Sequence, residues 1–332
     1  MSVAKRRETA LISVVAPVLD EQETLVAFYE RVCATLAESD FELVLVDDGS
    51  TDRTPELLAE LATNDPRVHV VRLSRNFGYQ AAVAAGLDHA AGDAVVTIDA
   101  DLQDPPELIP DLVEGWRDGS DVVYAVREAR EGESKMKLAT SRWFTRLFIR
   151  LAGLAIHPGV GDFRLLDRRV VDALRTMPER ARFMRGMTVW VGYTQSSIPY
   201  RRDPRHAGTT RYRWRTLLRI SLDALSSFSH APLQLATLLG FAVSFLAFLA
   251  IPYVIVNRAL GFYVEGVSTL LFAMLLLGGI QLITLGIIGE YVSRIYDEVK
   301  RRPLYLVRER INVSAPTDPR RETDVLSASE ID

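Results

Sequence analysis

The chain has 332 residues, of which 48% are hydrophobic and 25% charged; this is too apolar for a disordered protein, and the length predicts about two domains. It has 43 acidic and 39 basic residues, which give a formal net charge of -4. The chain as a whole is therefore not a polycation, which weighs against nucleic acid as a partner. The single cysteine, Cys33, excludes an internal disulfide and a cysteine-rich metal site.

The first segment of the chain combines a basic start with a short apolar run, MSVAKRRETALISVVAP. The run lacks both the length of a secretory signal and the small-residue cleavage site that would follow it. We therefore expect the amino-terminal part of the protein to stay in the cytoplasm.

Residues 11 to about 125 alternate short β-rich runs with amphipathic stretches, which is typical of a parallel sheet covered by helices. The predicted strands are 11–16, 43–46, 68–73, 94–98 and 122–124. The predicted helices are 21–39, 54–62, 79–91 and 106–117. The fold class expected for this part of the chain is α/β.

Two long apolar stretches, residues 232–256 and 267–288, contain no charged residue. Each reaches the roughly 20 residues needed to cross a hydrocarbon core, which predicts two transmembrane helices; a pair of buried core helices is the alternative. Basic residues flank their outer ends: Arg211, Arg213, Arg215 and Arg219 before the first, and Arg294, Lys300, Arg301 and Arg302 after the second. By the positive-inside rule, both termini are expected in the cytoplasm.

Residues 135–152 (KMKLATSRWFTRLFIRLA) place Arg142, Arg146 and Arg150 on one helical stripe beside aromatic and aliphatic residues. The pattern is typical of an interfacial helix on anionic lipid, and a core helix with a solvated basic face is the alternative. The polar tail from residue 313 is expected to be disordered. The expected division is 1–125 for the α/β core, 126–231 for a region with interfacial helices, 232–290 for two membrane spans and 291–332 for a cytoplasmic tail.

Acidic residues follow two of the predicted strands, at the carboxyl ends where ligands bind in an open α/β sheet. Asp47 and Asp48 follow the second strand, and Asp99, Asp101 and Gln103 follow the fourth. Carboxylates two residues apart in extended chain project to one side, so Asp99 and Asp101 are able to share a divalent cation, with Gln103 as a further ligand. Oxygen ligands favour Mg²⁺ or Mn²⁺, and magnesium often joins carboxylates to substrate phosphates, which indicates a diphosphate-containing substrate.

Both acidic clusters have a plainer interpretation. A lone Asp-x-Asp is often a solvated turn, and Asp47-Asp48-Gly49-Ser50 has the composition of a turn that leads into a helix cap. The sequence contains neither G-x-G-x-x-G after a strand nor G-x-x-x-x-G-K-[ST]. Their absence weighs against a dehydrogenase and against a P-loop NTPase.

A set of longer motifs occurs in a characteristic order: VVAPVLDEQETL, LVLVDDGSTD, RLSRNFGYQAAVAAGLDHA, VTIDADLQDPPE, GDFRLLDR, FMRGMTVWVGY and YRRDPRHAGTTRY, followed by the two spans. To about residue 300 this order resembles the inverting family-2 glycosyltransferases of the dolichyl-phosphate mannose synthase and bactoprenol glucosyltransferase group. The resemblance implies a GT-A-type, Rossmann-like domain with a mainly parallel sheet, on the cytoplasmic face of the bacterial inner membrane. It also implies transfer of a sugar from a nucleotide donor to a polyprenyl phosphate.

The resemblance implies roles for residues at the matching positions. The donor-binding residues are Pro17, Glu21, Asp47, Asp48, Arg75, Asn76 and Asp99, and the ligands for Mg²⁺ or Mn²⁺ are Asp99, Asp101 and Gln103. Leu19 and Asp20 depart from the aromatic-Asn pair that the family commonly has at this place, so ring stacking is lost there. For Arg75, surface decoration without a role is the alternative.

An acceptor phosphate is already ionised at neutral pH, so it can attack the anomeric carbon in one inverting displacement without a strong general base. Asp99 and Asp101 are the expected catalytic residues. Asp162, in Gly161-Asp162-Phe163-Arg164, is expected near the acceptor, either as a catalytic residue or in a positioning role. The cations expected on the acceptor phosphate are Arg127, Arg142, Arg205 and Arg211.

The sugar is assigned by analogy, since the two-span layout resembles that of bactoprenol glucosyltransferases and so indicates glucose from UDP-glucose and undecaprenyl phosphate as acceptor. Mannose or an N-acetylhexosamine is the alternative among enzymes, and a non-catalytic membrane scaffold is the alternative outside them. A processive polysaccharide synthase usually has Q-x-x-R-W, where this chain has Gly186-Met187-Thr188-Val189-Trp190. Gly278, Gly279 and Gly286 in the second span indicate a homo-oligomer packed through its membrane helices.

Overall fold

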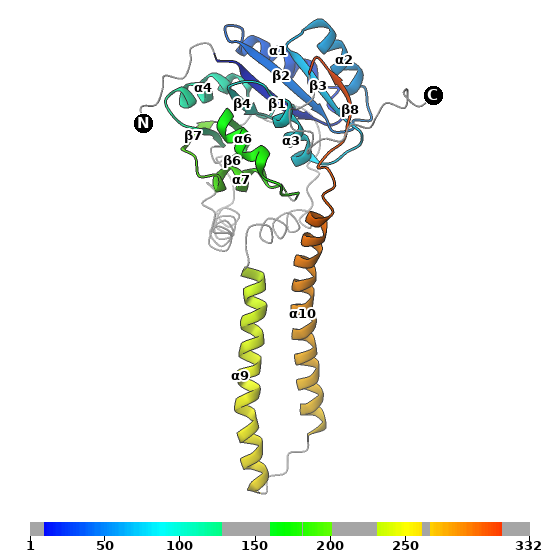
Figure 1. Cartoon of the computed structure of the whole chain (residues 1–332), viewed down its shortest axis with the longest axis vertical. Helices are drawn as coiled ribbons and strands as arrows, with labels where there is room; N and C mark the ends of the chain where they lie inside the picture. The colour runs from blue at the N-terminus through cyan, green and yellow to red at the C-terminus, as the bar shows by residue number, and fades with distance from the viewer. Residues whose placement is uncertain (1–9, 128–159, 181, 201–230, 261–265, 314–332) are drawn as a thin grey trace, which may run out of the picture. The chain divides into compact units, whose positions relative to one another are not determined.

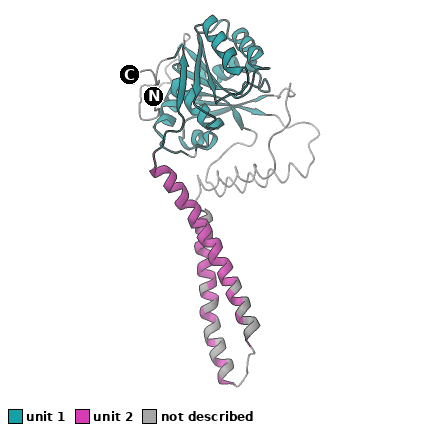
Figure 2. Ribbon diagram, turned by 90° about the vertical axis from the view of Figure 1, so that its right-hand side faces the viewer, with its two compact units in different colours: residues 1–146, 154–211, 302–332 teal, residues 147–153, 212–301 magenta. Residues whose placement is uncertain are grey.

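The computed structural model describes residues 10–127, 160–180, 182–200, 231–260 and 266–313. The chain divides into two compact units (Figure 2). The first takes in residues 1–146, 154–211 and 302–332, and the second takes in residues 147–153 and 212–301. The first unit therefore contains segments from both ends of the chain, and the second unit is inserted between them.

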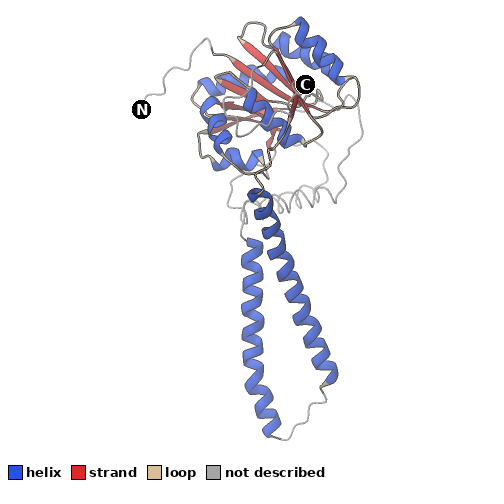
Figure 3. Ribbon diagram, turned by 45° about the vertical axis from the view of Figure 1, so that its right-hand side comes forward, coloured by secondary structure: helices blue, strands red, loops and turns tan. Residues whose placement is uncertain are grey.

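The first unit alternates strands and helices (Figure 1, Figure 3). Up to residue 117 its elements are β1 (Ile12–Val18), α1 (Leu25–Thr35), β2 (Phe41–Asp47), α2 (Thr54–Asn64), β3 (Val68–Leu73), α3 (Tyr79–His89), β4 (Ala94–Thr97), the 3₁₀ turn η1 (Pro106–Leu108) and α4 (Ile109–Arg117). The later elements are β5 (Val122–Arg127), β6 (Val160–Asp167), α6 (Arg168–Thr176), α7 (Met184–Trp190), β7 (Gln195–Tyr200) and β8 (Val307–Ile311). Each strand and helix predicted between residues 11 and 124 is present, with small shifts at its ends.

The strands of the first unit form one sheet in the order β7-β5-β6-β4-β1-β2-β3-β8. β1 pairs in parallel with β2 and with β4, β2 with β3, and β5 with β7. β6 runs antiparallel to β4 and to β5, and β8 runs antiparallel to β3. The α/β class with a mostly parallel sheet is therefore confirmed.

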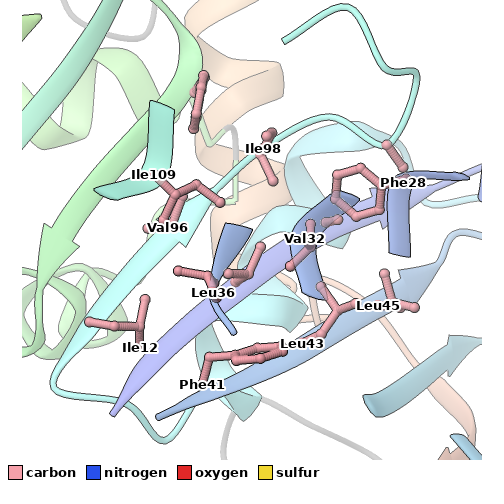
Figure 4. Close-up of a cluster of buried hydrophobic side chains, with 14 of the residues drawn as sticks. Ile12, Phe28, Val32, Leu36, Phe41, Leu43, Leu45, Val96, Ile98 and Ile109 are labelled. Carbon is pink, nitrogen blue, oxygen red and sulfur yellow. The ribbon is translucent and has the colours of Figure 1, made fainter. Parts of the chain in front are cut away.

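Helices cover both faces of this sheet. Alternate residues of β1 and β2, such as Ile12 and Leu43, point into a core that α1, α2 and α4 complete. Phe28 of α1 belongs to this core (Figure 4). The opposite face packs against α3 and α6. There α3 lies so close to the sheet that a Cβ on Gly86 would lie 2.2 Å from Val15 Cγ1. The central strands β1, β2 and β4 are buried at nearly every residue, because helices pack on both faces of the sheet, and this gives a three-layer arrangement.

The first unit extends beyond the boundary expected at residue 125. β6 and β7 belong to the same sheet as β1–β4, and β8, from the segment expected to be a cytoplasmic tail, forms its edge beside β3. The sequence VRERI of β8 contains only two apolar residues. Val307 is buried, whereas Arg308 and Glu309 face solvent. β8 pairs with β3, and β6 pairs with β4. These pairings satisfy backbone hydrogen-bonding groups that would otherwise be left unpaired at the outer sides of β3 and β4.

The described part of the second unit consists of two long helices that contact each other, α9 (Ala231–Ala259) and α10 (Val267–Val299). They carry the two apolar stretches predicted to cross a membrane. Large apolar side chains on both are exposed, to 72% for Phe241 and 71% for Leu282, as expected for a surface that contacts lipid or another apolar partner. Among the described residues, one stretch, Leu276–Val299, is long and apolar enough to cross a membrane. The predicted interfacial helix at 135–152 lies outside the described residues.

Candidate active site

The carboxyl ends of β1, β2, β3 and β4 lie at one edge of the sheet, because these strands are parallel. β6 is antiparallel to β4, with Arg164 opposite Thr97, so it begins at this same edge. β5 ends there opposite Val160, and β7 ends beside β5, with Tyr200 opposite Arg127. This edge, which we call the carboxyl edge, therefore brings together residues from seven strands or the loops beside them.

The loop after β2 is fastened to the loop after β3. Asp48 is buried, and its carboxylate accepts hydrogen bonds from the backbone N–H groups of Phe77, at 2.7 Å, and Gly78, at 3.0 Å. Burial raises the pKa of Asp48, and these two N–H groups oppose the shift. Gly49 has a φ of +78°, and a Cβ there would lie 2.6 Å from the carbonyl carbon of Arg75. The close approach of the two loops therefore depends on glycine at position 49.

Asp99 follows β4 and faces Tyr79, the first residue of α3. The Tyr79 hydroxyl donates a hydrogen bond to Asp99 Oδ1 at 2.7 Å. Burial, together with the negative charges of Asp104, Asp162 and Asp101, raises the pKa of Asp99 to about 7, although the Tyr79 hydrogen bond opposes this shift. A neighbouring cation stabilises the ionised form of a carboxylate crowded in this way.

The carboxylate of Asp101 accepts two hydrogen bonds from the next turn of the chain. The Gln103 backbone N–H donates to Asp101 Oδ1 at 3.1 Å, and Gln103 Nε2 donates to Asp101 Oδ2 at 2.6 Å. Leu102 between them has a φ of +60°, a left-handed conformation that costs about 1–2 kcal/mol when a side chain is present. Because the amide nitrogen of Gln103 faces Asp101, ligation of a cation by the amide oxygen requires the amide to turn over.

Asp104 anchors the ends of β5 and β7. Its buried carboxylate accepts hydrogen bonds from the Tyr200 hydroxyl and from Arg127 Nη2, the latter at 3.4 Å. Arg127 Nε also donates to the Tyr200 hydroxyl oxygen at 3.1 Å. Burial and the Asp104 hydrogen bond raise the pKa of Tyr200, so its phenol keeps its proton. Arg127, a predicted ligand of the acceptor phosphate, thus lies at the carboxyl edge.

Asp162, near the start of β6, is held by two guanidinium groups. Arg164 Nη2 lies 2.7 Å from its Oδ1, and Arg185 donates from Nε to Oδ1 at 3.1 Å and from Nη2 to Oδ2 at 2.7 Å. Burial acts to raise the pKa of Asp162, but Arg164 and Arg185 outweigh it and hold that pKa below its usual value. Arg164 is buried, whereas the Arg185 side chain is 38% exposed. Asp162 is therefore a weak base and a firm anchor for Arg185.

Asp47 and Asp20 shape the carboxyl edge from within. Asp47 has no exposed surface; its Oδ1 accepts from the Ser50 N–H at 2.8 Å, and its Oδ2 lies 3.2 Å from Arg72 Nε. Asp20 has a φ of +55° and accepts from the Thr51 N–H at 2.8 Å. Aspartate tolerates this left-handed conformation as asparagine does, so Asp20, at the position where the family commonly has asparagine, binds the loop after β2.

The other predicted donor contacts also lie in loops or strand ends at the carboxyl edge. Pro17 is partly buried beside Val46, and Glu21 Oε2 accepts from the Thr24 hydroxyl at 2.7 Å. Arg75 and Asn76 are exposed in the loop after β3. Their part in donor binding stays a prediction. The predicted phosphate ligands Arg142, Arg205 and Arg211 lie outside the described residues.

Four residues of the carboxyl edge were not predicted from the sequence: Tyr79, Asp104, Arg185 and Tyr200. Tyr79 and Arg185 fall within the motifs RLSRNFGYQ and FMRGM, so the signal for them was the motif itself. Their partners Asp99 and Asp162 lie about twenty residues away in the chain. No local pattern connects residues at such separations, because the packing of helices α3 and α7 against the sheet brings them together.

The residues of the carboxyl edge fit a cation of the Mg²⁺ or Mn²⁺ type. Burial raises the pKa of Asp99, and the negative charges of Asp104, Asp162 and Asp101 raise it further. Within the described part of the chain, no three His, Cys, Asp or Glu side chains form a metal cluster by themselves. An ion at Asp99 and Asp101 would therefore complete its coordination with water and diphosphate oxygens, as magnesium commonly does.

Comparison with known proteins places this site in a family. The family described as "Glycosyl transferase family 2" matches residues 13–175. The chain is 44% identical over 304 residues to an uncharacterized glycosyltransferase of Synechocystis sp., covering 91% of this chain and 96% of that protein. The chain belongs to glycosyltransferase family 2. It is also 41% identical over 301 residues to the SfII prophage-derived bactoprenol glucosyl transferase of Shigella flexneri, covering 90% and 97% of the two chains.

Among solved structures, the glucosyl-3-phosphoglycerate synthase of Mycobacterium tuberculosis in complex with Mn²⁺, UDP-glucose and phosphoglyceric acid has a TM-score of 0.40 at 21% identity. The match covers 64% of this chain and 76% of that one. A likeness at this level does not bear on function. The family-2 match itself extends from β1 to α6, so it includes Asp48, Asp99, Asp101 and Asp162.

Gly49→Ala is expected to open the contact between the loops after β2 and β3. The left-handed φ costs about 1 kcal/mol or more for alanine, and the new Cβ would lie 2.7 Å from the Asn76 backbone nitrogen. Thermal unfolding and the affinity for nucleotide measure the effect. Gly192→Ala is the matched control, because Gly192 has a φ of +71° but its Cβ would meet only the Trp190 carbonyl oxygen at 4.0 Å. Equal losses in the two variants would contradict a tight loop contact.

Asp99 is expected to make metal-free stability fall with rising pH. Its pKa is about 7 in the folded chain against an ordinary 3.8, so the folded state keeps a proton that the unfolded state has lost. The contribution of Asp99 is therefore present below pH about 4 and is lost as the pH rises through about 7. Asp99→Asn should flatten the thermal midpoint over this range, and Mg²⁺ or Mn²⁺ should raise the wild-type midpoint more at pH 8 than at pH 5. The same pH slope in both proteins would argue against this assignment.

Proposed function

We propose that this family-2 protein is a polyprenyl-phosphate glucosyltransferase, which transfers glucose from UDP-glucose to undecaprenyl phosphate with inversion. The observation that carries the proposal is the pairing, at one edge of the sheet, of crowded carboxylates with arginines held by Asp104 and Asp162. The carboxylates suit a cation with a donor diphosphate, and the arginines suit a second phosphate. Relatives at 41% identity are named bactoprenol glucosyl transferases, which supports lipid phosphate as the acceptor.

On the donor side, Asp48 is a preformed acceptor for the nucleoside, because two backbone N–H groups already fix its carboxylate. Asp99 and Asp101 would hold Mg²⁺ or Mn²⁺, which supplies positive charge to the departing nucleoside diphosphate. Gln103 keeps Asp101 oriented through its N–H and side-chain amide. Tyr79 orients Asp99 in the same way.

On the acceptor side, the reaction needs position and charge and no strong base. Asp162 is engaged by Arg164 and Arg185 and has a lowered pKa, so a positioning role suits it better than proton removal. Arg185 uses Nε and one terminal nitrogen on Asp162, and its 38% exposure leaves the rest of the guanidinium open to a phosphate. Arg127, anchored by Asp104, is a second cation for that phosphate.

Two membrane crossings are supported by the course of the chain. β7, before the second unit, and β8, after it, belong to the same sheet, so the chain enters and leaves any membrane on one side. An even number of crossings follows. α10 supplies one, and α9, with 29 residues, supplies the other, since about 20 helical residues span the hydrocarbon core. The basic residues after α10 favour an orientation with the sheet and both termini in the cytoplasm. Assembly of copies through these helices stays a prediction.

The sugar and the catalytic role have open alternatives. No side chain at the carboxyl edge distinguishes glucose from mannose or an N-acetylhexosamine within the described residues, so the names of relatives alone favour glucose. A non-catalytic scaffold of the same fold is disfavoured, because Asp99, Asp101 and Gln103 are all present and mutually oriented.

Asp101→Asn is expected to lower transfer by roughly 10²-fold or more, the scale of losing a key electrostatic group in an active site. The assay is extraction of radiolabelled sugar into organic solvent after incubation of UDP-glucose, undecaprenyl phosphate and Mg²⁺ or Mn²⁺ with purified protein. Asp40→Asn, at an exposed carboxylate, is the matched control. Chelation of divalent metal should match the Asp101→Asn loss. Full activity in chelator would remove the metal from the mechanism, and label from another nucleotide sugar would reassign the donor.

Arg185→Lys is expected to raise the KM for the lipid phosphate by about tenfold, because lysine keeps the charge but loses the planar two-point pairing with Asp162. The KM for the donor should change by less than about twofold, since Asp48 and Asp101 are untouched. Steady-state kinetics with each substrate varied in turn separate the two constants. Arg117→Lys, exposed on α4, controls for loss of a guanidinium. A change confined to donor KM would move Arg185 to the donor side.

A further inference from the structure

The segment that follows α10 is bound to the first unit along its whole length. We call residues 302–312 the C-terminal strap. Arg180 donates to the carbonyl oxygens of Arg302 and, at 3.3 Å, Pro303, and β8 then pairs with β3 (Figure 1). At the far end, Asn312 Nδ2 donates to the carbonyl oxygens of Ala62 at 2.6 Å and Val68 at 3.1 Å. Together with the buried side chains of Tyr305 and Val307, these bonds make the strap an integral part of the first unit.

The strap contacts the loop that fastens Asp48. The carbonyl oxygen of Leu306 accepts a hydrogen bond from the backbone N–H of Ser74 at 2.8 Å. Ser74 is the last residue before the loop whose Phe77 and Gly78 N–H groups bind Asp48. The strap therefore fixes the start of this loop, and the other end of the loop binds Asp48, the residue predicted to contact the nucleoside.

A second connection runs through charged side chains of β3. Arg72 lies between Glu309 of the strap, with Nη1 to Oε2 at 3.6 Å, and Asp47, with Nε to Oδ2 at 3.2 Å. Asp47 in turn accepts from the Ser50 N–H within the loop after β2. The strap thus contributes to holding both loops that meet at Gly49.

A third connection runs through α3. The Tyr305 side chain has no exposed surface, and its hydroxyl donates to Asp88 Oδ2 at 2.9 Å. Asp88 lies near the end of α3, the helix that begins with Tyr79 and so carries the hydroxyl bound to Asp99. A helix transmits a displacement of one end to the other, because its backbone hydrogen bonds make it nearly rigid.

We propose that the C-terminal strap is a positioning element of the donor site, with Tyr305 as its principal positioning residue. The strap holds the loop of residues 74–78 and helix α3 in the arrangement that binds Asp48 and Asp99, so donor affinity depends on a segment about 200 residues beyond the catalytic motifs. The donor itself rests on the function proposed above, but the ordering of the loop does not.

The test compares two tyrosines, Tyr305 and Tyr29, whose hydroxyls each donate a hydrogen bond of the same length to an aspartate. Tyr305→Phe removes the bond to Asp88. Tyr29→Phe removes a bond of the same length, 2.9 Å, to Asp65, which precedes β3 and so lies at the opposite end of that strand from the loop of residues 74–78. Tyr305→Phe is expected to raise the donor KM by about threefold or more, the scale of a lost hydrogen bond to a charged partner, with kcat nearly unchanged. Tyr29→Phe should leave donor KM as in wild type. Equal donor KM values in both variants would overturn the proposal.

Hydrogen exchange tests the same proposal without turnover. In Tyr305→Phe, the amides of residues 74–79 should exchange several-fold faster than in wild type and in Tyr29→Phe, at a temperature where all three proteins are folded. If Tyr305→Phe does not fold, Arg180→Gln loosens the start of the strap without touching the core and should produce the same change. Unaltered exchange at residues 74–79 would refute the strap's role. Absence of sugar transfer by wild type, with exchange altered as expected, would reject the proposed function and leave the strap's role standing.

Discussion

Crowding of carboxylates at the carboxyl edge is the constraint on which the rest of this structure depends. Burial raises the pKa of Asp99, and the nearby negative charges of Asp104, Asp162 and Asp101 raise it further. Buried charge of one sign persists only when it is paired. Arg127 and Arg164, with Arg185, supply the pairing for Asp104 and Asp162, while Asp99 keeps a raised pKa.

That uneven pairing divides the edge into two chemically different halves. Asp162 and Asp104 are committed to arginines, so they orient cations and are poor ligands for a metal. The hydrogen bonds of Asp99 and Asp101 come from neutral groups, Tyr79 and Gln103, so neither carboxyl group is neutralised by these partners. A phosphate acceptor suits the first half and a cation with a diphosphate suits the second, which is the arrangement that a base-free displacement between two phosphate compounds needs.

The return of the chain to the sheet links the two ends of the protein. β8 covers the edge of β3 and prevents that edge from pairing with another chain. The strap places Tyr305 against α3, which carries Tyr79. It also places Leu306 and Glu309 against Ser74 and Arg72, and Arg72 in turn contacts Asp47. An edge strand of this kind has a structural reason in backbone hydrogen bonding, and its position beside the donor loops gives it a functional consequence.

The sequence by itself determined the α/β class, the elements up to residue 124, the acidic clusters and the family, because each leaves a local signal. Short apolar β-rich runs, acidic residues at strand ends and motifs of about ten residues are each visible within short windows of sequence. It did not determine that β6, β7 and β8 join the same sheet, nor that Arg185 lies on Asp162 and Tyr79 on Asp99. Those contacts depend on strand pairing and on helix packing between residues far apart in the chain, and polar strands such as β8 carry little hydrophobic pattern. Tertiary structure alone decided which charges are paired, and therefore which carboxylates remain available to a cation.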